Sequence, residues 1–315
     1  MSLILTKVNH VGTILASFCL TALSETAMIE RLLGALSAKH LTRGARTTAA
    51  LAVAMSLGWA DATRPAAAPI TFSATGADAA SIQGTVDAYR AALGNPNNGN
   101  TPGSQPGGRR EINWDGGGAA ALATVFPSPM TTFSNRGNVN VTPGTGFEIS
   151  GQPSPEFGDI NATYPGIFTT FSAPRLFAPL GSNILDVLFT VPGTTDVPAV
   201  TTGFGAVFTD VDLAATTTLE FFDALNQSLG VFSVPTLDSG LSFLGIQFNA
   251  GEAVSRVRIT LGNAALGPND GGDVDVVALD DFIYAEPRAV AEPATLALLG
   301  LGLAGLGVMR RRRAA

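Results

Sequence analysis

Residues 203–211 read GFGAVFTDV, and the alternation of their side chains indicates a β-strand. In an extended chain Phe204 and Phe208 project to one side, while Val207 and Thr209 project to the other. Apolar residues stand on both sides of this segment. It therefore predicts one strand of a larger β structure.

Similar short segments, separated by turn residues, extend in both directions from this strand. They are residues 137–141, 146–150, 167–171, 184–191, 203–211, 217–222, 228–234, 241–248, 254–261 and 274–284. The chain has 36 Gly and 19 Pro, which is typical of turn-rich β architecture. We predict a mainly β fold, an antiparallel β-sandwich of the jelly-roll type.

The segment before these strands follows a different pattern. Ile82, Val86, Tyr89 and Leu93 recur at helical spacing, which predicts a helix ending before Gly94. The next residues, 95–108, are so rich in Asn, Pro and Gly that we expect a long loop too polar to pack.

Charge and composition exclude several classes of function. The 315 residues carry a net charge of −7, and the stretch from 63 to 290 carries about −12, with nine Arg and no Lys. Nucleic-acid binding is not expected, because phosphate contacts need clustered Lys and Arg. Both His, both Lys and the single Cys lie in the first 40 residues. Without that leader the chain has no Ser–His or Cys–His nucleophile and no His or Cys zinc site.

The C-terminus has three consecutive parts. Glu292-Pro293 is followed by an apolar run from Leu296 to Met309 and then by four arginines, Arg310, Arg311, Arg312 and Arg313. As a helix, the run spans about 21–24 Å, short of a bilayer core of about 30 Å unless the arginines reach the interface. We predict a single transmembrane helix with its arginines in the cytoplasm. The alternative is a tail helix packed on the domain.

This tail resembles the PEP-CTERM sorting signal of exported proteins in Gram-negative bacteria. The hydrophobic helix and arginine cluster match that signal, as does Glu292-Pro293, whereas Ala291 replaces its first proline. The resemblance implies cutting near Glu292-Pro293 by an exosortase-type membrane protease. It also implies an association with extracellular polysaccharide. Residues 109–116, 203–212 and 277–284 resemble ectodomains of such proteins, a likeness that brings no activity with it.

The N-terminus contains an apolar stretch behind basic residues and before small-residue cleavage sites, as export signals do. Met28 is the expected start of translation. We divide the chain into a leader (1–62), an N-terminal segment with its loop (63–108), a β-sandwich ectodomain (109–287) and the sorting tail (288–315). The protein is then anchored transiently in the inner membrane before it reaches the envelope, surface or extracellular matrix.

Aspartates are concentrated near the last predicted strand and offer a calcium site. Ca²⁺ takes six to eight oxygen ligands and tolerates irregular loops. We place Asp281 at the centre of this site with help from Asp273, Asp115 and Asp275. The alternative is a set of Asp-Gly turns and a solvated acidic edge.

Two further features bear on function. Trp114, in Asn113-Trp114-Asp115-Gly116, is either a platform for sugar rings or a core residue. A carboxylate-based glycosidase would need two paired acids, and none of Glu148, Glu156, Glu220 and Glu252 lies in a recognisable motif. We therefore expect a non-enzymatic protein that binds or organises exopolysaccharide. The alternatives are a purely structural matrix component and a glycoside hydrolase.

Overall fold

The structure is a computed structural model and describes residues 68–290. The predicted leader, the tail helix and the residues of the sorting motif lie outside this range. Within residues 68–290, no helix combines the length and the apolar character needed to cross a membrane.

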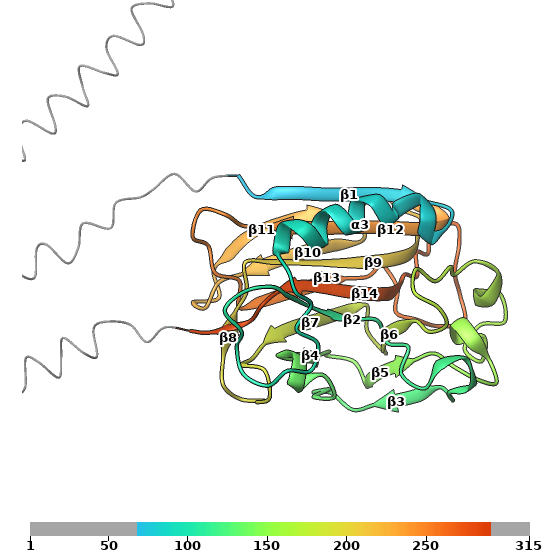
Figure 1. Cartoon of the computed structure of the whole chain (residues 1–315). Coiled ribbons are helices and arrows are strands. Elements are labelled where there is room, and N and C mark those ends of the chain that lie inside the picture. The colour runs from blue at the N-terminus through green and yellow to red at the C-terminus, as the bar shows by residue number, and fades with distance from the viewer. Residues whose placement is uncertain (1–67, 291–315) are drawn as a thin grey trace, which may run out of the picture. The chain divides into compact units, whose positions relative to one another are not determined.

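Two antiparallel sheets contain most of the strands (Figure 1). The eight-stranded sheet has the order β1-β12-β9-β14-β6-β5-β3, with β2 paired to β14. Its strands are β1 (Ile70–Gly76), β2 (Arg109–Ile112), β3 (Thr124–Phe126), β5 (Gly146–Ile149), β6 (Phe177–Leu180), β9 (Gly203–Val211), β12 (Leu237–Gln247) and β14 (Ala278–Ala285).

The second sheet has the order β11-β10-β13-β7-β4, and β8 and β15 form a separate pair. The strands are β4 (Asn138–Val141), β7 (Ile184–Phe189), β8 (Ala199–Val200), β10 (Thr218–Phe222), β11 (Ser228–Ser233), β13 (Arg256–Thr260) and β15 (Arg288–Ala289). The helices are α3 (Ala79–Leu93) and the short 3₁₀ turns Gly118–Ala120, Ser134–Arg136, Pro155–Phe157 and Tyr164–Gly166.

The two sheets pack face to face, which is consistent with the predicted β-sandwich, and the predicted mainly β fold of antiparallel sheets is confirmed. Phe204 and Phe208 of β9 lie in one apolar core with Val187 of β7 and Val257 of β13. Burial of this apolar surface is the main driving force for the fold. Every residue of β9 is buried, because its other face is covered as well.

Helix α3 covers that other face (Figure 1). Its buried side chains Ile82, Val86 and Tyr89 pack on Val207 of β9 and its neighbours in the sheet. The Asp78 side chain accepts a hydrogen bond from the Ser81 amide at the start of the helix, and Gly94 ends it with φ 104°. The helical spacing predicted for this segment is thus confirmed.

The structure corrects two of the expectations. Residues 167–171 form no strand, and their segment lies over the outer face of the sheet, where Phe168 packs on Ala278. The polar loop 95–108 packs on the domain, contrary to expectation, because its amide groups donate hydrogen bonds to a buried carboxylate. The Asn98 side chain and the Gln105 amide both donate to the Glu286 carboxylate, at 2.8 and 2.9 Å.

Candidate functional site

A polar pocket with a volume of about 410 Å³ lies where α3, β2 and β14 meet. Eight of its nine lining side chains are polar or charged, and the ninth is aromatic. They are Gln83, Arg90, Asn97, Glu111, Asn113, Arg136, Phe171, Ser172 and Asp281. These nine residues come from six separate stretches of the chain, so no local sequence motif indicates the pocket.

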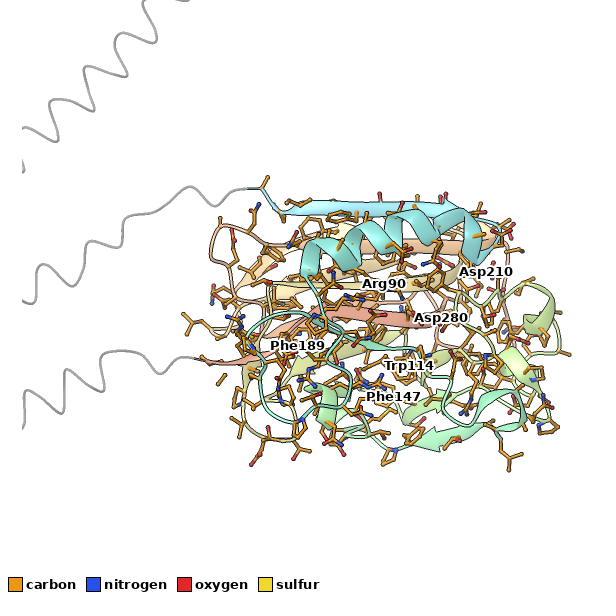
Figure 2. All side chains as sticks on the ribbon, viewed as in Figure 1. Arg90, Trp114, Phe147, Phe189, Asp210 and Asp280 are labelled. Atoms are coloured by element: carbon orange, nitrogen blue, oxygen red, sulfur yellow. The ribbon has the colours of Figure 1, made fainter. Side chains whose placement is uncertain are left out.

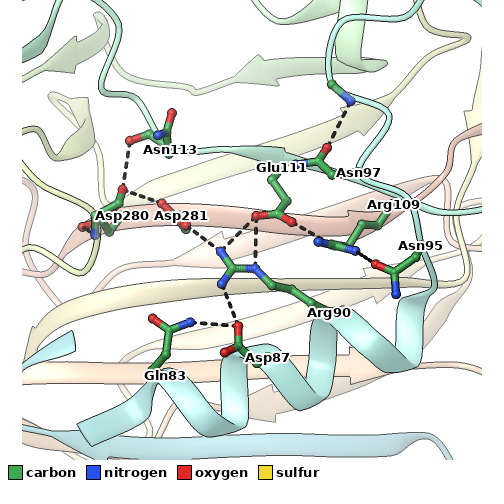
Figure 3. Close-up of polar contacts among 12 residues, drawn as sticks. Gln83, Asp87, Arg90, Asn95, Asn97, Arg109, Glu111, Asn113, Asp280 and Asp281 are labelled. Carbon is green, nitrogen blue, oxygen red and sulfur yellow. Dashed lines mark hydrogen bonds and ion pairs between the residues drawn. The ribbon is translucent and has the colours of Figure 1, made fainter. Parts of the chain in front are cut away.

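Arg90 is the centre of the polar contacts in this pocket (Figure 3). It lies in the last turn of α3, directly after the buried Tyr89, so packing of the helix aims it over the sheet. Its guanidinium donates to Glu111 at 2.9 and 3.1 Å, to Asp87 at 3.1 Å and to Asp281 at 3.3 Å. One arginine thus ties the helix to β2 and β14.

Two adjacent aspartates of β14 point to the same loop. In a regular strand they would face opposite sides of the sheet. The register of β14 against β9 shifts between Leu279 and Phe282, and such an irregularity re-aims side chains. As a result the Ser172 hydroxyl lies 3.0 Å from Asp280 Oδ1 and 2.7 Å from Asp281 Oδ1.

Burial raises the pKa of both carboxyl groups. The pKa of Asp280 lies well above its ordinary value, because the group is desolvated and faces the charge of Asp281. The pKa of Asp281 rises to about 6, where burial outweighs its hydrogen bond with Ser172 and the charge of Arg90. The two groups therefore titrate as a coupled pair that keeps its proton to a higher pH than exposed carboxyl groups do.

The four aspartates predicted as calcium ligands do not come together. Asp115 and Asp281 share the loop at residues 171–175, since the Arg175 amide donates to Asp115 at 3.2 Å and Ser172 binds Asp281. Asp275 is fully buried elsewhere and accepts from the Asp212 amide at 3.2 Å. Asp273 is exposed. None of the four belongs to a group of three convergent carboxylates within the described residues.

A different set of aspartates does converge. Asp210, Asp212 and Asp270, here the acidic cluster, place one carboxylate oxygen each within 4.8 Å of the others. Asp210 lies in β9, and Asp270 lies in the acidic loop before β14. Asp212 Oδ1 is buried and has no hydrogen-bond partner among the described residues. Figure 2 shows Asp210 at one end of β9, away from Arg90.

Burial and neighbouring negative charges raise the pKa values of two aspartates in the acidic cluster. The pKa of Asp210 rises to about 7 and that of Asp212 to about 6, mainly through desolvation and then through neighbouring aspartates. Asp210 and Asp212 are two residues apart in the sequence, whereas Asp270 joins them only in the fold. The sequence did not show that the Asp275 carboxylate is bound by the loop after β9. The Thr216 hydroxyl and the backbone amides of Asp212 and Leu213 donate hydrogen bonds to it.

Trp114 lies in the core and is not a sugar platform. Only 2% of it is exposed, and its ring stacks on Phe177 with centroids 3.8 Å apart. The indole Nε1 donates to the Asp280 carbonyl at 2.7 Å. The core alternative considered for this residue is therefore the one the structure adopts, because both the ring and its polar atom find partners inside.

The fold and the pocket define a β-sandwich domain with a polar surface site. Residues 289–313 match the PEP-CTERM protein-sorting motif, as the sequence of the tail predicted. No curated protein and no solved structure matches the chain significantly. The chain thus carries the sorting signal of an exported protein that is held transiently in the membrane and processed by exosortase.

Proposed function

We propose that this exported protein binds extracellular polysaccharide in the polar pocket and does not hydrolyse it. The observation that supports this proposal is the set of side chains that line the pocket. Its amide, hydroxyl and charged groups offer donors and acceptors for sugar hydroxyls, and Phe171 offers an apolar face for a sugar ring. The pocket is also fixed in shape by the contacts of Arg90, which limits the entropy lost on binding.

The engagement of the acids supports binding without hydrolysis. A glycosidase needs one carboxyl group that can reach the glycosidic oxygen and a second one at the sugar carbon. Asp281 lines the pocket, and its two oxygens accept from the Ser172 hydroxyl at 2.7 Å and from Arg90 at 3.3 Å. Both oxygens of Glu111 are engaged by arginines. Neither acid is free to attack or protonate a substrate in this arrangement.

The test is binding of the producer's own polysaccharide to the purified full chain in mild detergent. Replacing Gln83 and Asn113 together by alanine removes two hydrogen-bonding side chains from the rim of the pocket. We expect the affinity to fall about tenfold, since each lost bond costs about 0.5–1.5 kcal/mol.

The matched control removes Gln227 and Asn249, two exposed side chains outside the pocket, and should keep the wild-type affinity. Absence of saturable binding by the wild type would instead support a structural matrix protein without a ligand. Equal affinity of the two double variants would place the binding surface elsewhere. Release of reducing sugar would support the hydrolase.

We further propose that the acidic cluster holds a structural Ca²⁺ ion. The buried and unpartnered Asp212 Oδ1 favours this, because a buried carboxylate oxygen without a donor is costly unless a proton or a cation neutralises it, and three convergent carboxylates suit a cation. The proposed ligands are therefore Asp210, Asp212 and Asp270. They differ from the ligands predicted from the sequence, which were Asp281, Asp273, Asp115 and Asp275.

Calcium is expected to raise the melting temperature measured against EDTA. At a free concentration one hundred times the Kd, the stabilisation is about 2.7 kcal/mol. Asp212→Asn should lose most of this shift, while the exposed Asp196→Asn should keep it. A wild-type melting temperature that is the same in EDTA and in millimolar calcium would reject the ion.

A further inference from the structure

The charges that line the polar pocket are not all paired with one another. Arg90 makes ion pairs with both lining acids, Glu111 at 2.9 Å and Asp281 at 3.3 Å. Glu111 is paired a second time, to Arg109 at 2.6 Å. Arg136 makes no ion pair with any carboxylate between residues 68 and 290. It is therefore the lining cation whose charge is left without a partner.

Arg136 is nevertheless held in place. Its Nε donates to Asn100 Oδ1 at 2.9 Å, and its Nη1 donates to the Glu111 carbonyl. The guanidinium carbon lies 5.6 Å from the centroid of the Phe133 ring. These contacts fix the plane of the guanidinium but use only two of its five N–H groups. Both N–H groups of Nη2 and one of Nη1 make no hydrogen bond within the described part of the chain.

A planar guanidinium edge with free N–H groups matches a carboxylate. The surroundings favour a single negative charge over a multiply charged anion, because Glu111 and Asp281 line the same pocket and the region from 63 to 290 carries about −12. The rest of the lining consists of amides, a hydroxyl and Phe171, which suit a sugar ring with neutral hydroxyls.

We infer that the polar pocket recognises an acidic sugar, a uronic acid unit whose carboxylate is bound by Arg136. This inference rests on the proposed function, since it names the class of sugar that the pocket selects. The sugar carboxylate pairs with Arg136 in the way that the carboxylates of Glu111 and Asp281 pair with Arg90. The amide side chains that line the pocket contact the sugar hydroxyls.

The experiment compares two probes that differ only at one carboxyl group. They are the methyl glycoside of galacturonic acid, which carries one negative charge, and the neutral methyl ester of that glycoside, titrated calorimetrically into the purified full chain in detergent. We expect the wild type to bind the acid about tenfold more tightly than the ester, with the difference shrinking as salt is added. Equal affinities for acid and ester would overturn the inference without any variant.

Arg136→Gln should abolish the preference for the acid, so that the acid and the ester bind with equal affinity. Arg136→Lys keeps the charge but loses the planar fork, so part of the preference should remain. The matched control is Arg288→Gln, which removes the same charge from an arginine that does not line this pocket. Retention of the acid preference by a folded Arg136→Gln protein would also overturn the inference.

The producer's polysaccharide separates this inference from the proposed function. If that polymer binds and the acid probe is not preferred, the proposed function stands and the role of Arg136 is wrong. If neither the polymer nor either probe binds, the proposed function fails and this inference fails with it.

Discussion

Replacing Glu286 by alanine is expected to lower the free energy of unfolding by about 3–5 kcal/mol. Arg110 and Glu286 form a two-point ion pair, with N–O distances of 2.7 and 2.8 Å, and their side chains are 0% and 2% exposed. The variant leaves the Arg110 charge in the interior without a counter-charge. It also removes the acceptor that holds Asn98 and Gln105 of the polar loop.

Urea denaturation of the purified protein measures this loss. A double variant, Arg110→Met with Glu286→Leu, should recover part of the stability, because both buried charges are then gone. Asp87→Ala provides the contrast and should cost less than about 1 kcal/mol, since Asp87 is exposed and Arg90 keeps its ion pairs with Glu111 and Asp281. A Glu286→Ala protein within 1 kcal/mol of the wild type would show that the pair is not the anchor of the loop.

The Asp280→Asn variant is expected to be more stable than the wild type at pH 8 and equal to it at pH 4. The folded-state pKa values of Asp280 and Asp281 both lie above the unfolded value of 3.8. Such groups stabilise the fold fully below the unfolded pKa, and this stability is lost as the pH rises through the folded pKa, here about 6 for Asp281. Asparagine keeps the shape, cannot ionise and can donate to Asp281 in place of the proton.

Thermal or urea unfolding between pH 4 and pH 8 tests this expectation in one buffer series. The wild type should lose stability toward pH 8, and the asparagine variant should lose less. Asp196→Asn, at an exposed position, should follow the wild-type curve. An Asp280→Asn curve parallel to the wild type, or one below it at pH 8, would mean that the buried pair does not share a proton.

Several features of this protein could be predicted because they depend on neighbours along the chain. The alternation around Phe204 and Val207 marked β9. The spacing of Ile82, Val86 and Tyr89 marked α3, and Gly94 marked its end. The Glu292-Pro293 tail with its arginines marked the sorting signal. β1 was not foreseen, because as an edge strand with one partner, β12, it carries few buried side chains.

The amino-acid sequence by itself determined the mainly β class of the fold and the sorting signal of an exported protein, because periodicity and contiguous motifs are local properties. Tertiary structure alone decided which polar residues work together. Arg90, Glu111 and Asp281 meet across a helix and two strands, and Asp210 meets Asp270 from sixty residues away. It also decided that Trp114 is core. Such contacts depend on strand order, on a register shift in β14 and on which face is buried, and no spacing along the chain encodes them.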